Sequence, residues 1–340
     1  MTRIGVAFSG GLQPADIVQC VKLADELGYE SAWVAEGHGG DQFAILAAAA
    51  AVTRRIKLGT SISSVFVRSA STIAMAAATV DQLSGGRFIL GLGSSHRVQV
   101  EPEHGVPFVQ PTQRLRETVD VVRGLVRDGA VVYSGKVVTI ERFELWFTPL
   151  RREIPIYISA LFPPMLQIGG EIADGVLLTW PTAESGRRAV DNVAIGARRA
   201  GRKPESIDVA SLIPCYIARD QREAFDGMRN AVAFYAGFFP RYNRLLAEAG
   251  FAEAVASIKE AFDRGDRAEA ARRVPDALLA VITAAGTPEQ CREKVEAYRR
   301  AGIALPIISP RASGPGGTRM AMEALRACAP VTPAPSRTSR

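Results

Sequence analysis

The chain alternates short apolar runs with longer segments of helical periodicity, and this alternation constrains the fold more than any other feature. Eight runs are expected to be strands: 3–8, 31–35, 56–60, 88–91, 154–159, 175–179, 207–213 and 303–309. Segments with apolar residues at helical spacing separate most of them, such as 13–27, which Gly28 ends. Eight strands that alternate with helices predict a parallel sheet closed into an α/β (β/α)₈ TIM barrel.

Two parts of the chain depart from this alternation. Residues 131–147 fit a β-hairpin with its turn at Ser134-Gly135-Lys136. Residues 219–280 are mostly helical and too long for a simple connection, so we expect an insertion there. The organisation predicted is one barrel domain over 1–328, followed by a disordered tail over 329–340, which is rich in Pro, Ser, Thr and Arg.

A doubly wound open sheet is the competing architecture. It usually carries a G-x-G-x-x-G turn after its first strand, whereas this chain has Ser9-Gly10-Gly11 there. The segment Gly91-Leu92-Gly93 matches part of a dinucleotide fingerprint, but it follows the fourth expected strand and lacks the third glycine. These observations favour the closed barrel and give only weak support to an NAD site.

Charge and cysteine content exclude several classes of function. The net charge is +6, but no Lys/Arg run exceeds two residues, so we expect no nucleic-acid partner. No uncharged apolar run reaches the roughly 18 residues of a membrane span, and the first residues lack a signal-peptide pattern. The four cysteines have no CxxC spacing, so we expect no metal site, no disulfide and a cytoplasmic location.

Barrel enzymes place their active sites at the C-terminal ends of the strands. The residues at these ends are mostly small or polar: Glu36, His38, Ser61, Ile62, Ser63, Ser64, Ser94, Ser95, His96, Ser159, Ala160, Thr179, Trp180, Ser309 and Arg311. Small hydroxyl side chains suit a flat ring that lies across the barrel mouth. No G-x-S-x-G elbow accompanies these serines, so a serine nucleophile is not indicated.

Two of the three histidines, His38 and His96, fall on this rim. Histidine is the usual side chain for moving protons near neutral pH. One rim histidine is more often a surface or packing residue, but two at separate strand ends favour catalysis. His104 falls in a predicted loop over 102–107 and is expected to have no such role. Glu36 could act as an acid, accept hydrogen bonds from a cofactor ring, or cap a helix.

Two further patterns are open to a functional or a structural interpretation. The segment 313–317 precedes the last helix, where barrels often bind phosphate through backbone N–H groups, and Arg311 and Arg319 flank it. A flexible glycine turn explains that segment equally well. Four aromatic residues could line an apolar pocket, although their spacing is also typical of core packing: Trp180, Phe238, Phe239 and Tyr242.

Several segments resemble the luciferase-like monooxygenase superfamily, and the resemblance covers about residues 1–325. The segments are 36–38, 58–64, 81–93, 169–176 and 285–291. The most specific parts are Ser84 to Gly93 and Gly170 to Val176. The chain resembles most the deazaflavin-dependent branch, which includes methylenetetrahydromethanopterin reductase.

This resemblance implies a bacterial luciferase-like barrel that binds coenzyme F-420, an 8-hydroxy-5-deazaflavin, at its mouth. Hydride would pass between the cofactor ring and a small carbonyl, alcohol or conjugated compound. The resemblance also implies that a cis peptide bond at Ser61-Ile62 props the ring into a bend. The other residues that match cofactor-contacting positions are Glu36, Ser64, Ser94, Ser95, Ser159, Ala160 and Thr179. His96 stands where a sugar-phosphate enzyme of this branch has a catalytic glutamate.

The chain departs from the family pattern where the cofactor tail would bind. Residues 161–164, which include two prolines, replace a glycine-rich stretch that offers backbone N–H groups. Thr182 occupies the place of a phosphate-binding lysine. The tail would then be held through Arg311 or Arg319.

Other interpretations stay open at this point. Gly37 separates Glu36 from His38, two positions that are often adjacent in the family, so His38 could point elsewhere. An FMN-dependent monooxygenase would share the barrel, and a non-catalytic barrel that has lost its cofactor is a third alternative. Analogy with the family predicts a homodimer.

Overall fold

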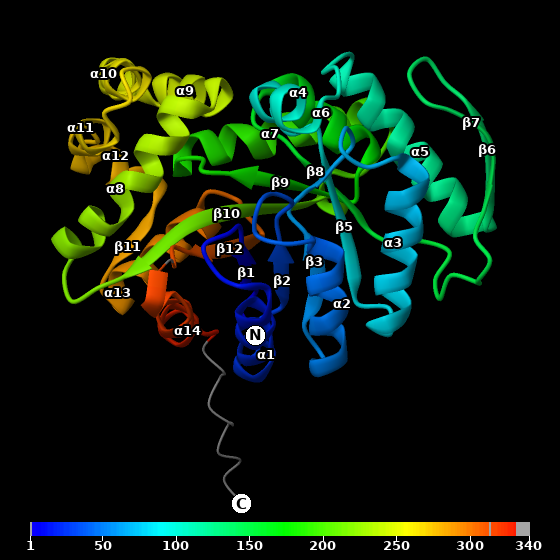
Figure 1. Cartoon of the computed structure of the whole chain (residues 1–340), viewed down its shortest axis with the longest axis horizontal. Coiled ribbons are helices and arrows are strands. Elements are labelled where there is room, and N and C mark those ends of the chain that lie inside the picture. The colour runs from blue at the N-terminus through cyan, green and yellow to red at the C-terminus, as the bar shows by residue number, and fades with distance from the viewer. Residues whose placement is uncertain (1, 313, 331–340) are drawn as a thin grey trace, which may run out of the picture.

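The computed structural model describes residues 2–312 and 314–330. Its central element is a closed barrel of eight parallel strands (Figure 1). In order around the barrel they are β1 Gly5–Phe8, β2 Ser31–Val34, β3 Lys57–Thr60, β5 Phe88–Gly93, β8 Ile156–Ser159, β9 Gly175–Thr179, β10 Asp208–Ile217 and β12 Leu305–Pro310. Because β12 pairs with β1 and β9 with β10, the sheet closes, and the predicted barrel is confirmed.

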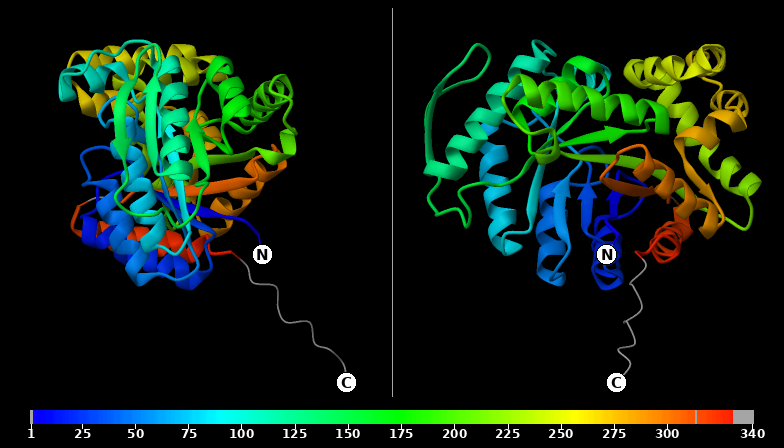
Figure 2. Two further views of the ribbon diagram at one scale, coloured as in Figure 1. Left: turned by 90° about the vertical axis from the view of Figure 1, so that its right-hand side faces the viewer. Right: turned by 180° about the vertical axis from the view of Figure 1, so that it is seen from behind.

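Helices cover the outside of this barrel (Figure 2). They are α1 Pro14–Leu27, α2 Gln42–Val52, α3 Ala70–Leu83, α5 Pro111–Asp128, α6 Pro163–Ile172, α7 Ala183–Arg199, α13 Pro288–Arg300 and α14 Gly317–Ala327. The residues predicted to cap helix ends do so. Gly28 ends α1 with a φ of 85°, and the Asp41 side chain accepts a hydrogen bond from the Ala44 N–H at the start of α2.

Several shorter elements are present in addition to the barrel strands and the outer helices. The predicted hairpin is present as β6 Ala130–Ser134 and β7 Thr139–Glu144, and it stands outside α5 (Figure 1). Three further elements had no sequence signal: β4 Ser63–Ser64, β11 Ala284–Gly286 and the 3₁₀ turn Pro204–Ser206. The expected loop over 102–107 is wrong at its start, because helix α4 spans Arg97–His104 with Pro102 inside it and His104 as its last residue.

The segment between β10 and β11 is helical. It contains α8 Gln221–Phe238, α9 Pro240–Leu246, a π-helical turn Ala247–Phe251, α10 Ala252–Asp263, α11 Arg267–Arg272 and α12 Asp276–Ile282. These helices bury their own hydrophobic cluster, which includes Met228, Leu246 and Ile258, and Trp180 from the end of β9 joins it. Figure 1 shows α9 above the C-terminal ends of the strands, so this segment reaches the barrel mouth.

The barrel interior is filled below the mouth. Trp33 is fully buried there, its ring centroid lies 5.5 Å from that of Tyr157, and a Cβ on Gly59 would come within 2.4 Å of its ring. At the N-terminal end, Arg3 forms salt bridges with Glu30 and Asp208. These groups close the lower end, so a ligand can approach the interior from the C-terminal end.

Two further expectations concern membrane-spanning helices and the tail over 329–340. Among the residues that the structure describes, no helix combines the length and the apolar character that crossing a bilayer requires. The predicted tail lies outside the described residues from position 331 onward.

Candidate active site

Small side chains form the floor of the barrel mouth. Because side chains alternate along a strand, Ser159 and Thr179 follow the inner residues Tyr157 and Leu177 and face the mouth one layer above them. Gly93 lets Ile62 and Ser159 pack closely in this layer, since a Cβ there would lie 2.8 Å from Ile62 and 3.4 Å from the Ser159 Cβ. The floor is therefore closely packed and built from small side chains.

The segment after β3 carries polar atoms that find no partner among the described residues. The Ser61-Ile62 peptide bond is cis, as the resemblance implied. The hydroxyls of Ser61 and Ser63 are buried, and no other described residue forms a hydrogen bond with them. A buried hydroxyl without a partner is costly, so a ligand that supplies one is favoured here.

Glu36 positions that segment. One of its carboxylate oxygens accepts a hydrogen bond from the Ser64 N–H at 2.7 Å, and the other accepts one from Arg68 Nε at 2.5 Å. Arg68 also binds Asp41 at 2.5 Å. Burial acts to raise the pKa of Asp41, but hydrogen bonds from Arg68 and the Ala44 N–H outweigh it and keep that pKa below its ordinary value. Glu36 thus uses both oxygens within the protein to hold the turn.

Ser94 and Ser95 follow β5 and meet an arginine from the helical insertion. Arg241 Nη1 donates to the Ser94 hydroxyl oxygen at 3.2 Å and to the Ser95 carbonyl at 3.3 Å. The guanidinium also lies 5.6 Å from the centroid of the Phe108 ring. Arg241 is half-buried, and burial lowers its pKa. This places a cation beside two of the predicted site residues.

His96 packs against aromatic residues at the same edge. We call Trp180, Tyr235, Phe239 and Tyr242 the aromatic wall. The His96 ring centroid lies 4.6 Å from that of Phe239 and 5.3 Å from that of Tyr242. Burial, and secondarily the charge of Arg241, lower the pKa of His96 to about 4. His96 is therefore a neutral imidazole near neutral pH.

Two residues at the mouth adopt a backbone conformation that favours glycine. Ser95 has a φ of 54° at the end of β5, and Trp180 has a φ of 57° at the end of β9. Each such residue costs on the order of 1–3 kcal/mol and persists only where the surroundings enforce it. Strained residues of this kind cluster at functional sites, which supports placing the site between these two strand ends.

Three further predicted residues are His38, Ala160 and Arg311, and they have different surroundings. His38 is 79% exposed, and its Nε2 lies 3.2 Å from a Glu103 carboxylate oxygen, so it points toward solvent rather than into the mouth. The Ala160 side chain is buried. Arg311 lies close enough to Tyr235 for its charge to oppose the rise that burial causes in the pKa of that tyrosine.

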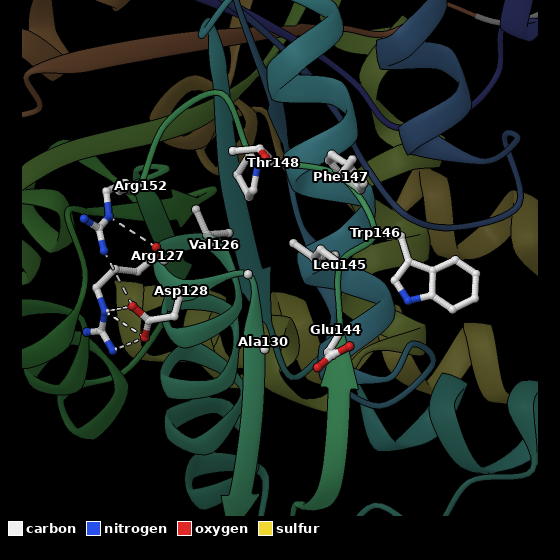
Figure 3. Close-up of a pocket in the computed structure, with 12 residues that line it drawn as sticks. Val126, Arg127, Asp128, Ala130, Glu144, Leu145, Trp146, Phe147, Thr148 and Arg152 are labelled. Atoms are coloured by element: carbon white, nitrogen blue, oxygen red, sulfur yellow. Dashed lines mark hydrogen bonds and ion pairs between the residues drawn. The ribbon is translucent and has the colours of Figure 1, made fainter.

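The glycine-rich segment after β12 forms a 3₁₀ turn over Gly314–Gly316, and Ser313 lies outside the described residues. A hollow of about 570 Å³ lies elsewhere, where α5 ends and the hairpin begins (Figure 3). Its lining includes Arg127, Asp128 and the 97% exposed Trp146. It belongs to the opposite end of the barrel, since α5 runs away from the mouth, and it shares no residue with the predicted site.

Arg241 is one residue of this site that the sequence pattern missed, as are Arg68 and Tyr235. Arg241 lies 147 residues from Ser94, and its neighbours Phe239 and Tyr242 read equally well as core packing. Only the folded insertion brings it to the mouth.

The fold is that of a barrel enzyme whose mouth lies between polar strand ends and an aromatic wall. Residues 1–305 match the family described as luciferase-like monooxygenase. The chain belongs to this family.

Two similar proteins are both reductases named for tetrahydromethanopterin compounds. A 5,10-methylenetetrahydromethanopterin reductase of Archaeoglobus fulgidus is 30% identical over 88% of this chain and 91% of its own length. The solved structure of the coenzyme F-420-dependent tetrahydromethanopterin reductase of Methanopyrus kandleri superposes with a TM-score of 0.86 at 28% identity, covering 96% and 98% of the two chains. An FMN complex of the oxygenating constituent of 3,6-diketocamphane monooxygenase from Pseudomonas putida shares the fold, with a TM-score of 0.71 at 16% identity, over 97% of both chains.

Proposed function

We propose that this chain is a coenzyme F-420-dependent oxidoreductase that transfers a hydride between the cofactor and a small carbonyl, alcohol or conjugated compound. The observation that carries the proposal is the nearly full-length similarity, at 28–30% identity, to two tetrahydromethanopterin-type reductases, one of which is named as F-420-dependent. Similarity to the FMN enzyme is confined to the fold at 16% identity. F-420 is therefore favoured over FMN, and FMN-dependent oxygenation is the alternative.

The residues at the mouth fit a flat ring with polar edges. The unpaired hydroxyls of Ser61 and Ser63 offer hydrogen bonds at the floor. Ser94 and Ser159 add hydroxyls from two further strand ends. When bound, F-420 supplies a ring carbon that gives or accepts the hydride.

The protein's own groups position the floor of the site and provide a route for a proton. Glu36 fixes the 61–64 segment through the Ser64 N–H, so the floor is formed before a ligand arrives. His96 is neutral, so one ring nitrogen can donate a proton while the other accepts one. We assign His96, rather than the exposed His38, the exchange of a proton with a substrate oxygen. The aromatic wall excludes water from that edge of the mouth.

A turnover screen tests this function. Oxidised F-420 with secondary alcohols, and reduced F-420 with carbonyl and conjugated compounds, are each followed by the change in cofactor absorbance. We expect hydride transfer in one of these panels and none when FMN replaces F-420. Oxygen-dependent product formation with reduced FMN would instead assign the FMN-dependent alternative.

We also propose that the protein is a homodimer built on α2 and α3. Helix α2 contains no charged residue, and Asp81, the one charged residue of α3, is buried in a salt bridge with Arg151. The outer faces of these helices instead expose small and apolar residues, including Ala48, Val52 and Met75. Uncharged faces on two adjacent helices are typical of subunit interfaces.

A cytoplasmic location is the remaining proposal. Its support is the state of the four cysteines, all of which are free thiols buried in the structure. Persistent free thiols fit a reducing compartment.

A further inference from the structure

Arg241 at the barrel mouth has N–H donors that form no hydrogen bond with any described residue. Nη1 contacts Ser94 and Ser95, but within residues 2–312 and 314–330 neither Nε nor Nη2 has an acceptor, and no carboxylate lies within salt-bridge distance. These two nitrogens are not sealed from solvent, since they are absent from the group of buried unpaired atoms. The guanidinium therefore presents its free donors to the open mouth.

Two other arginines around the mouth are neutralised within the protein, whereas Arg311 and Arg114 form no salt bridge with a described residue. Arg68 pairs with Glu36 and Asp41, and Arg97 pairs with Glu101. A half-buried cation is unfavourable without a counter-charge, and burial lowers the pKa of Arg241. The missing counter-charge is the observation that points to a ligand.

Aromatic side chains lie at the same edge of the mouth as Arg241. Trp180 and Tyr235 stack with centroids 4.1 Å apart, and His96 lies against Phe239. These rings favour a flat apolar body, while a guanidinium binds a carboxylate through two parallel hydrogen bonds. His96 is neutral, so the second cation on this side of the mouth is Arg311, whose charge reaches Tyr235.

We infer that the substrate is a flat conjugated or aromatic carboxylate, whose carboxylate binds Arg241 and whose body packs against the aromatic wall. This inference rests on the proposed function and names its substrate class. The same oxyanion chemistry could come from the phosphate of the cofactor tail. We assign it to the substrate because Arg241 reaches the mouth from the aromatic side, between the wall and the end of β5.

The test compares acids with their neutral amides on the enzyme loaded with F-420. Calorimetric titrations with benzoate and benzamide, and with cinnamate and cinnamamide, measure the preference for a carboxylate. We expect at least one acid to bind at least about tenfold more tightly than its amide, as hydrogen bonds to a charged group imply. Arg241→Gln should abolish that preference, and Arg241→Lys should keep part of it.

Arg244→Gln is the matched control, because Arg244 lies one turn further along α9, is exposed and pairs with Glu248. It should leave the preference unchanged. Equal binding of acids and amides by the wild type, or a preference that survives Arg241→Gln, would overturn the inference.

A second titration separates the two sources of the anion. The affinity of Arg241→Gln for F-420 should stay within about twofold of the wild-type value. A tenfold loss of F-420 affinity would assign Arg241 to the cofactor tail and refute the substrate assignment. If the wild type binds no F-420, the proposed function fails, whereas the acid and amide titrations on the free protein still decide the inference.

Discussion

Replacing Glu36 with Gln tests how the floor of the site is held. Gln keeps the size of the side chain and one acceptor oxygen, but it removes the charge. A hydrogen bond to a charged group contributes about 1.5–3 kcal/mol, so we expect Glu36→Gln to lower the free energy of unfolding by about 2–3 kcal/mol. With an unfolding entropy of about 2.1 cal/mol/K per residue, the Tm should fall by roughly 3–4 °C.

The same change should weaken cofactor binding. The NH2 group that Glu36→Gln introduces would face one of two donors, the Ser64 N–H or Arg68, so the 61–64 segment is held less firmly and must be ordered when F-420 binds; a cost of about 1.4 kcal/mol corresponds to a tenfold loss of affinity. Glu171→Gln is the matched control. The Glu171 side chain is 14% exposed against 16% for Glu36, and it also pairs with arginines, but it lies at the far end of α6.

Differential scanning fluorimetry and F-420 titration are the two assays. We expect both variants to lose stability and Glu36→Gln alone to lose affinity. Unchanged F-420 affinity in Glu36→Gln would refute the positioning role of Glu36, and an equal loss in Glu171→Gln would show that the effect is a general loss of stability.

The other predictions concern the histidines and the dimer. His96→Gln should reduce turnover by about 10²–10⁴-fold, while His38→Gln should leave it near the wild-type value; the reverse pattern would assign catalysis to His38. Unfolded protein takes up the His96 proton near pH 6.5 and folded protein near pH 4, so wild-type stability should fall by about 3 kcal/mol as the pH drops through this window. Denaturant titrations should show this fall reduced in His96→Gln and unchanged in His38→Gln. Ala48→Glu with Met75→Glu should convert a dimer into monomers in light scattering; a dimer that survives would place the interface elsewhere.

Local patterns were sufficient to predict the fold. Strand and helix positions follow from periodicity and from end signals such as Gly28 and Asp41, which act within a few residues. Helix α4 was not predicted, because Pro102 and the polar residues around it are typical of a loop. The closed barrel follows from the number and alternation of the elements.

The site was only partly predictable, because its residues come from distant parts of the chain. The strand-end rule placed Ser61, Ser94 and His96 on the rim. It could not show that both oxygens of Glu36 are bound inside the protein, since Arg68 lies 32 residues away. Arg241 enters from an insertion whose path no local pattern specifies.

The most direct test of the central claim is equilibrium binding of the purified protein to F-420 and, separately, to FMN, followed by fluorescence. The account predicts tight binding of F-420 and much weaker binding of FMN. Preference for FMN, or binding of neither cofactor, would contradict it.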